Sequence, residues 1–492
     1  VEFGREGDVG QPFVDRRPSL RLIEVRFPGN ADENRRSFLV LQGKFIDGKR
    51  EPIELSQTRD DPIRRFISED QDTAKAIDHV IIFRGKTNVR SQTSSMRIVS
   101  LCHHTIPSHH TNTQQLVWTT TELARLGHHV EVVCCKSDAV GPAWREQIVD
   151  YYGLDALPDS IDFVPVCSDR ADSILPEARA DLRNVRHARR HRHALIHTRD
   201  PFALTLALAA GLNCVFETYR VDINEDAIFG PWRALNYRRK NLLGVVTHSD
   251  LCRQSFIKAG IPEARVMTNY NGYAAALFTP PLSREAARAH LGLETADCIA
   301  TYAGRVDISK GTDFLVQVAR QLPDVIFLLV GAVPGSAEER TVLHHIQEAG
   351  VKNVRLRPRV EPSEVAAYLF ASDCLVIPPT AAPLREHGRT VLPMKTFSYL
   401  AAGRPIVAPD LPDLREVLHH QENALLVPPD DVAAAAAAVR LAVSHRPDTE
   451  KLGYAARQNA AYFTWQARAR RFSAFLQSVC PEFQPGEPNQ SR

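Results

Sequence analysis

The chain has 492 residues, of which 44% are hydrophobic and 24% are charged, so its composition is that of a globular protein and excludes wholesale disorder. The formal net charge of +2 is too balanced for a dedicated nucleic-acid-binding protein. The longest apolar runs, such as 324–331, are as long as strands and too short for a membrane-spanning helix. The charged first residues and the nine scattered cysteines, with no CxxC, favour a reducing cytoplasm without a disulfide framework or a zinc site.

Residues 1–95 differ in pattern from the rest of the chain. The stretch 37–55, with Asp47-Gly48 between two apolar runs, predicts a β-hairpin closed by a tight turn. The segment is either a dispensable extension or a small β-rich accessory domain, and the sequence leaves both interpretations open. Two further strand candidates in it are 21–27 and 79–83.

From Met96 onward, short apolar runs alternate with segments of helical periodicity. This alternation predicts two doubly wound α/β domains, 96–275 and 276–450, each a parallel sheet with helices on both faces. A helix at 451–480 and a polar tail at 481–492 follow. The expected strands are 97–101, 129–134, 162–166, 194–198, 214–217 and 244–247 in the first domain, and 298–303, 325–330, 353–356, 374–377, 405–408 and 424–427 in the second.

Ligands of open α/β sheets bind beyond the carboxyl ends of the strands. Two such domains in one chain therefore predict a site between facing strand ends. The loops expected to line it follow Leu101, Glu217, Ala303, Val330 and Ile377.

The first local signal is Gly304-Arg305, followed by Lys310-Gly311, between a strand and a helix. Glycine lets the backbone approach a ligand closely, and Arg305 and Lys310 can both converge on phosphate oxygens. The spacing differs from a Walker phosphate loop, so phosphate binding here need not mean ATP hydrolysis. The alternative interpretation is a solvated basic turn.

The second signal is the helix predicted at 394–402, which ends at Gly403 and leads directly into a strand. Pro393 suits the first turn of a helix, where a missing N–H group costs nothing. A helix N-terminus offers free N–H groups to an anion, and Lys395 adds positive charge there. The alternative is an ordinary helix–strand unit with a glycine cap.

The order and spacing of these segments make residues 96–480 resemble the large retaining family 4 of nucleotide-sugar glycosyltransferases, in its Pro-x-Lys variant subfamily. That family has the GT-B fold of two facing Rossmann-like domains. In the second half the resemblance rests on Gly304-Arg305, Lys310-Gly311, Pro393-Met394-Lys395, Tyr399 to Gly403 and Asn423 to Pro428. In the first half it rests on Glu122 to Val130, Thr198-Arg199-Asp200-Pro201 and Val215-Phe216-Glu217.

The resemblance implies an enzyme that moves a sugar from a nucleotide sugar of UDP or GDP type to an unknown acceptor, with retention and without a metal or cofactor. Arg305 and Lys310 would bind the leaving diphosphate. Arg359 and Val360 would meet the nucleobase. Other residues implied on the donor side are Gly304, Gly311, Gly331, Thr390, Val391, Leu392, Lys395 and Ser398. Residues implied on the first-domain side are His109, Thr111, Asn112 and Glu217.

Three positions depart from the family pattern. Thr390 and Ser398 stand where two glutamates are common, and Glu386 lies close enough in sequence to substitute for one of them. Tyr219 stands where a histidine near the donor sugar is usual; a phenol, with a pKa near 10, can hydrogen-bond a sugar hydroxyl but cannot act as a base at pH 7. The alternatives are therefore a catalytically weakened nucleotide-sugar-binding regulator and, less favoured, an epimerase.

Two clusters remain. His103-His104 and His109-His110 are interpreted as a surface loop or a ligand contact, and not as a metal site, because no acidic residue lies at ligand spacing in the sequence. The six arginines of 179–192 form either a solvated helix face or a contact with an anionic membrane surface or acceptor. The expected location is the cytoplasm, with peripheral membrane contact left open, and no nucleic-acid partner is expected.

Overall fold

The structure is a computed structural model, and it divides the chain into two units, residues 1–92 and 93–492. In the first unit, β1 (Arg21–Val25) pairs antiparallel with β2 (Ser37–Leu41). The Asp47-Gly48 turn and the strand predicted at 79–83 lie outside the described residues. The structure describes residues 21–25, 37–41, 95–136, 143–167, 174–220, 230–381 and 392–480.

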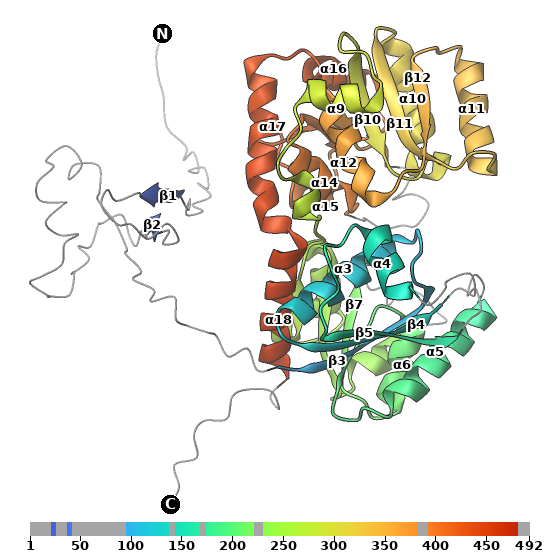
Figure 1. Cartoon of the computed structure of the whole chain (residues 1–492), viewed down its shortest axis with the longest axis vertical. Helices are drawn as coiled ribbons and strands as arrows, with labels where there is room; N and C mark the ends of the chain where they lie inside the picture. Colours follow the sequence, from blue (N-terminus) through green and yellow to red (C-terminus); the bar gives the residue numbers. More distant parts are fainter. Residues whose placement is uncertain are drawn as a thin grey trace, which may run out of the picture. The chain divides into compact units, whose positions relative to one another are not determined.

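The first half of the second unit is a seven-stranded parallel sheet with the order β5-β4-β3-β6-β7-β8-β9. Of these strands, Figure 1 labels β3, β4, β5 and β7. Its strands are β3 (Arg97–Thr105), β4 (His129–Cys135), β5 (Ile161–Cys167), β6 (Leu195–Thr198), β7 (Cys214–Thr218), β8 (Leu242–Thr247) and β9 (Val266–Thr268). Its helices are α3 (Thr111–Arg125), α4 (Trp144–Tyr152), α5 (Ile174–Ala188), α6 (Pro201–Ala209), α7 (Gly230–Tyr237) and α8 (Asp250–Lys258).

The second half is a six-stranded parallel sheet with the order β12-β11-β10-β13-β14-β15. Together the two sheets confirm the predicted α/β fold with two doubly wound domains. The strands of the second sheet are β10 (Cys298–Ala303), β11 (Val325–Ala332), β12 (Val354–Pro358), β13 (Cys374–Val376), β14 (Ile406–Pro409) and β15 (Leu425–Val427). Its helices are α9 (Arg284–Leu291), α10 (Thr312–Gln321), α11 (Ala337–Ala349), α12 (Pro362–Ala371), α14 (Lys395–Ala402), α15 (Pro412–Arg415), α16 (Val432–Ala442) and α17 (Pro447–Ala460).

Strand β11 shows why a continuous apolar run forms a strand here. All eight of its residues are buried. Successive side chains point to opposite faces of a sheet. Ile326 and Leu328 accordingly pack into one hydrophobic cluster and Phe327 and Leu329 into another, on the two faces. A parallel strand covered by helices on both sides therefore needs apolar residues at every position.

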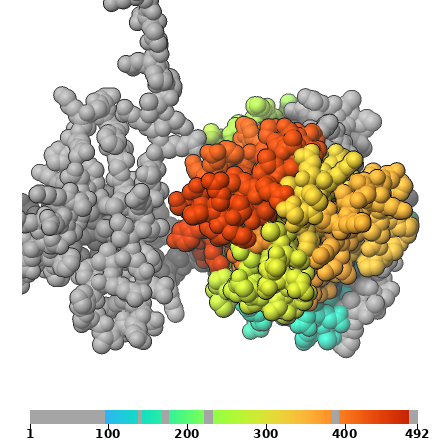
Figure 2. Space-filling model, turned by 90° about the horizontal axis from the view of Figure 1, so that it is seen from above, coloured from blue at the N-terminus to red at the C-terminus, as the bar shows by residue number. Residues whose placement is uncertain are grey.

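The C-terminal segment, predicted as one helix at 451–480, forms two helices that link the two halves. α17 contacts α14 in the second half, while α18 (Trp465–Val479) packs against α3 in the first half (Figure 1). From above, the orange-red C-terminal segment lies against the yellow and orange segments of the second half (Figure 2). α14 and α17 meet at two glycines: a Cβ on Gly453 would lie 2.4 Å from the carbonyl oxygen of Gly403. Among the described residues, no helix is long and apolar enough to span a bilayer.

A disulfide joins Cys135 and Cys167, at the ends of the neighbouring strands β4 and β5. The expectation that the cysteines form no disulfide is therefore wrong at this pair. The two residues are 32 positions apart in sequence, and only the register of the sheet places them opposite one another, with their Cα atoms 4.8 Å apart. Spacing along the chain carries no signal for such a pair.

Candidate functional site

The carboxyl ends of β10 and β11 come into direct backbone contact through two glycines. The N–H group of Gly304 donates to the carbonyl oxygen of Val330 at 2.9 Å. Gly331 has a φ of +121°, and a Cβ there would lie 2.1 Å from the carbonyl oxygen of Gly304. Only glycine fits at position 331. The predicted glycine positions thus bring the two loops together at one edge of the sheet.

Gly311 places Lys310 in the same region. It has a φ of +81°, and a Cβ there would lie 2.5 Å from Cγ2 of Thr380, in the loop after β13. The hydroxyl of Thr380 donates to Asp430 at 2.7 Å, which holds that loop in place. The short helix Ile308–Lys310 therefore lies close over the end of β13, at the expected ligand-binding edge.

Lys395 begins α14 and is half-buried beside Gly304. Its Nζ lies 3.6 Å from the ring centre of Tyr302, and a Cβ on Gly304 would come within 2.5 Å of it. Burial, and then the nearby ammonium of Lys310, hold the pKa of Lys395 well below its usual value. No carboxylate of the described residues forms an ion pair with either lysine. Two close cations without a counter-charge favour an anionic ligand.

Arg305 completes this group of cations and faces outward. Its side chain is 57% exposed, and its Nε lies 3.7 Å from Asp307, which also accepts from the N–H group of Ser309. Leu392 is buried in the core of the second half, and Ser398 is half-buried on α14. Three further predicted residues, Glu386, Thr390 and Val391, lie outside the described residues.

Arg359, after β12, approaches the first half of the chain. Burial and then the Arg359 guanidinium lower the pKa of His109, which lies in the loop before α3. His109 also hydrogen-bonds the hydroxyl of Tyr151, and burial with the Glu361 carboxylate raises the pKa of that hydroxyl to about 12. Val360 packs at the edge of a hydrophobic core in the second half of the chain. Two predicted groups, His109 and Arg359, therefore lie close together across the two halves.

The other first-half residues lie at the ends of β3 and β7. Thr111 is exposed and begins α3, and the carbonyl oxygen of Asn112 accepts from Arg199 at 3.1 Å. Tyr219 is 37% exposed, and its ring centre lies 6.3 Å from that of His248. Arg220 donates to the Tyr219 hydroxyl at 3.3 Å. A surface phenol supported in this way is available to a ligand.

Glu217 does not line the site surface, contrary to expectation, because it is fully buried. Its carboxylate accepts from Arg468 of α18 at 2.5 Å, from His248 at 2.6 Å and from His197 at 2.9 Å, and also from the Gln115 side chain. Burial works to raise the pKa of Glu217, but Arg468 and the two histidines hold it well below its usual value. Glu217 therefore fastens α18 to the first sheet.

Two family models match the chain, one in each half. The model described as Glycosyltransferase Family 4 matches residues 113–276, and the model described as Glycosyl transferases group 1 matches residues 297–445. Each half is thus similar to a glycosyltransferase family model, and the match in the first half agrees with the family 4 resemblance seen in the sequence. The Pro-x-Lys subfamily stays a prediction.

The curated relatives match over part of their length. The D-inositol 3-phosphate glycosyltransferase of Xylanimonas cellulosilytica is 30% identical over 213 residues, covering 41% of this chain and 49% of that protein. The protein of the same name from Jonesia denitrificans is 27% identical over 210 residues, covering 40% and 48%. The chain thus spans about half the length of the curated relatives it matches.

Solved structures match over both halves. Sucrose-phosphate synthase from Thermosynechococcus elongatus superposes with a TM-score of 0.63 at 19% identity, covering 79% of this chain and all of that one. HepE from Anabaena, solved in complex with UDP, gives 0.59 at 18% identity, covering 78% and 100%. These similarities establish the GT-B fold.

One cluster of this GT-B chain is not predicted by the sequence. His103 Nδ1 lies 3.4 Å from Asp181 and 3.4 Å from Asp200. No acidic residue lies at ligand spacing from these histidines in the sequence, but α5 and the start of α6 bring both carboxylates to the end of β3. The only signal in the sequence was Asp200 within the segment from Thr198 to Pro201. The adjoining pocket is lined by Leu101, Cys102, His103, Asn112, Leu116, Arg199 and Asp200.

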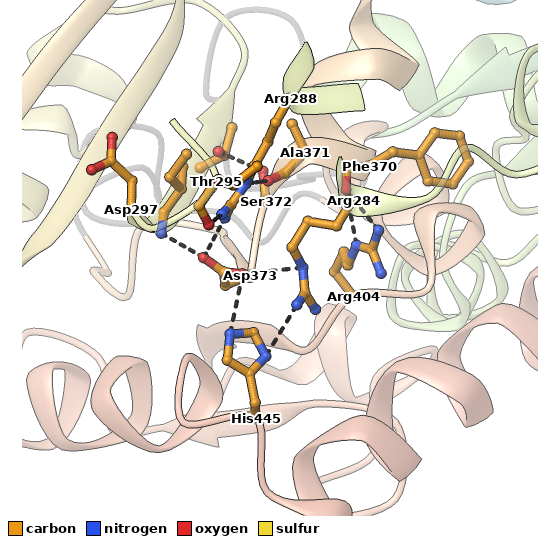
Figure 3. A network of polar contacts seen from close by, with 12 residues as sticks. Arg284, Arg288, Thr295, Asp297, Phe370, Ala371, Ser372, Asp373, Arg404 and His445 are labelled. Carbon is orange, nitrogen blue, oxygen red and sulfur yellow. Dashed lines mark hydrogen bonds and ion pairs between the residues drawn. The ribbon is translucent and has the colours of Figure 1, made fainter. Parts of the chain in front are cut away.

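A second charged cluster lies at the amino ends of the strands of the second sheet, on the side away from the proposed ligand-binding edge (Figure 3). Asp373 accepts from Arg288 at 2.7 Å and from the N–H group of Ile299 at 2.7 Å, and it pairs with Arg284 at 3.1 Å and His445 at 3.3 Å. These partners come from α9, β10 and the segment after α16. Because the cluster is internally paired and lies away from the carboxyl ends, we assign it to holding these elements together.

Proposed function

We propose that this chain transfers a sugar from a nucleoside-diphosphate sugar to an acceptor, with retention of configuration and without a metal at the diphosphate. The observation that carries the proposal is the pair Lys310 and Lys395 beside Gly304, two close cations without an acidic partner in the described part of the chain. A diphosphate supplies the missing negative charge.

The chemistry follows from where charge develops. When the bond between the sugar and the diphosphate breaks, negative charge accumulates on the leaving phosphate oxygen. Fixed cations and backbone N–H groups directed at that oxygen lower the barrier without reorganisation. Arg305, Lys310 and Lys395 supply the cations, and the N-terminal turn of α14 supplies N–H groups and the positive end of a helix dipole. We expect Tyr219 to contact the sugar.

Similar proteins suggest which donor and acceptor to test first. HepE has been solved with UDP and with UDP-glucose, so uridine diphosphate is the first nucleotide to test. The curated relatives are named D-inositol 3-phosphate glycosyltransferases, so an inositol phosphate is the first acceptor to test. The comparisons do not favour the regulator or epimerase alternatives.

An anionic acceptor or membrane surface also suits the first half. Electrostatic attraction concentrates anionic partners at a surface rich in one sign of charge. The arginines exposed on and after α5 are Arg179, Arg183, Arg186, Arg189, Arg190 and Arg192.

Binding of UDP to variants tests the proposed cradle. Arg305→Ala and Lys310→Ala should each weaken UDP at least tenfold, because a charge-assisted contact contributes about 1.5–3 kcal/mol and tenfold corresponds to about 1.4 kcal/mol. Lys352→Ala, at an exposed lysine before β12, is the matched control and should bind normally. Isothermal calorimetry with UDP, GDP and ADP measures this. Unchanged affinity in both variants would refute the assignment.

A further inference from the structure

Three ligand-type side chains meet at the end of β3. His103 comes from β3, Asp181 from α5 and Asp200 from the residue that precedes α6. One nitrogen and two carboxylate oxygens, one from each residue, all lie within 4.8 Å of one another. The His103 Nδ1 is 3.4 Å from an oxygen of each aspartate.

These spacings suit a metal ion better than a hydrogen bond. An N–H···O hydrogen bond usually spans about 2.7–3.2 Å, so both contacts are longer than a typical one. A tetrahedral zinc ion binds nitrogen and oxygen at about 2.0–2.2 Å, which separates its ligand atoms by about 3.3–3.6 Å. The two spacings from His103 Nδ1 to the carboxylate oxygens, both 3.4 Å, fall inside that interval.

Two of the three ligand atoms are buried, and their ion-pair contacts with one another and with Asp200 are not hydrogen bonds. In the part of the chain that the structure describes, His103 Nδ1 and Asp181 Oδ1 form no hydrogen bond, and the two side chains are 9% and 3% exposed. Leaving a buried polar atom unpaired costs about 1–3 kcal/mol, and more for a charged group. A bound cation would satisfy both atoms at once.

The third ligand is oriented by the backbone. Asp200 Oδ1 accepts from the N–H groups of Phe202 at 2.7 Å and Ala203 at 2.9 Å, at the start of α6. This bond pair fixes the carboxylate and leaves Oδ2 directed at His103. Hydrogen-bonded support of this kind is typical of metal-ligating carboxylates.

We propose that His103, Asp181 and Asp200 form a site for a divalent transition-metal ion of the zinc type. Three protein ligands leave the fourth position of a tetrahedral ion open. His103 and Asp200 also line the pocket described above, together with Arg199 and Asn112, so the open position faces that pocket and can take a water or an anionic oxygen of a ligand. The inference does not depend on the proposed transfer, because its readout is cation binding.

The competing arrangement is a protonated His103 that bridges the two carboxylates without a metal. The full chain, stripped with a chelator, is titrated with Zn²⁺ by calorimetry and with Co²⁺ by visible absorption. We expect one equivalent of each ion and the intense absorption of tetrahedral Co²⁺. A chain that binds neither ion overturns the proposal in favour of the proton bridge.

Two substitutions assign the site. Asp181→Asn and Asp200→Asn should each weaken Co²⁺ at least tenfold. Asn caps a helix about as well as Asp, so Asp200→Asn keeps the start of α6 intact, and melting curves verify folding even if Asp181→Asn is unstable. Glu131→Gln is the control, because Glu131 belongs to the second group of possible ligands, with His187 and His191. Tight binding that survives at Asp200→Asn but is lost at Glu131→Gln would overturn the assignment.

Discussion

At the scale of single residues, the positive charge of Lys395 lowers the stability of the folded protein. Lys395 is half-buried beside Tyr302 and Lys310, and its pKa is held well below normal by burial first and by Lys310 second. A base whose folded pKa is depressed makes the folded state less stable at every pH below its unfolded pKa. Such strain is common where a protein prepares a binding site before the ligand arrives.

Replacing Lys395 by methionine should therefore change stability and binding in opposite directions. Lys395→Met removes the charge and leaves an unbranched side chain that is one atom shorter, so we expect a gain of about 0.5–2 kcal/mol in unfolding free energy. UDP affinity should fall at least tenfold. Urea unfolding and calorimetry measure the two effects. A loss of stability would show that Lys395 has an internal partner, and normal UDP binding would show that its charge does not act on the diphosphate.

His248 gives the chain a pH dependence. Burial lowers its pKa to about 4, against about 6.5 in an unfolded chain. As pH falls from about 6.5 towards 4, the unfolded state takes up a proton that the folded state does not, so stability falls by about 1.4 kcal/mol per pH unit from this residue. His248→Gln keeps an N–H donor near Glu217 and should remove about one proton from the slope between pH 6.5 and 5. Urea unfolding across that range checks this; an unchanged slope would contradict it.

At the scale of elements, α18 depends on one buried ion pair. Arg468 is fully buried, donating to Glu217 at 2.5 Å and to Thr119 of α3 at 2.8 Å. On the apolar face of the same helix, Phe472 and Leu476 pack into the hydrophobic core of the first half. Packing fixes where the helix lies, while the ion pair fixes its rotation and register against β7 and α3.

Removing one partner of this pair should be costly. Arg468→Met leaves the Glu217 carboxylate buried with reduced compensation, and breaking a buried pair in this way costs about 3–5 kcal/mol. Arg470→Met, at an exposed position on the same helix, is the matched control and should change stability little. Chemical denaturation followed by circular dichroism gives both numbers. Equal stability of the two variants would show that apolar packing alone holds α18.

At the scale of the whole second unit, a carboxylate from one half caps a helix of the other. Glu416, directly after α15, accepts from the N–H groups of Asp250 at 2.7 Å and Leu251 at 3.0 Å, at the start of α8. It also accepts from the hydroxyl of Tyr270 at 2.9 Å. A negative charge at a helix N-terminus is stabilising, so this contact favours the observed arrangement of the two halves.

Glu416→Ala should loosen that arrangement. We expect a larger radius of gyration in solution scattering without nucleotide, and faster hydrogen exchange at the start of α8. Adding a nucleotide sugar should restore part of the compaction if the ligand bridges the halves. Glu422→Ala, at an exposed glutamate nearby in sequence, is the control. Identical scattering of the two variants would mean that other contacts fix the two halves.

The sequence by itself determined the elements and the glycine positions. The apolar run 325–330 predicted β11, because a strand buried on both faces is apolar throughout. Gly304 and Gly311 marked the loops that bend sharply after β10, and Gly403 marked the end of α14, where its φ is +66°. These properties are local: side-chain alternation, backbone freedom and the absence of a Cβ act on neighbours in the chain.

Only the tertiary structure decided which distant residues meet. Strand order places β3 between β4 and β6, which brings Asp181 and Asp200 to His103 and leaves Glu217 inside the molecule beneath α18. The register of β4 against β5 likewise sets Cys135 opposite Cys167. The sequence does not distinguish a buried carboxylate, thiol or imidazole from an exposed one. Their roles depend on long-range packing, and contacts between residues far apart along the chain produce no periodic pattern in the sequence.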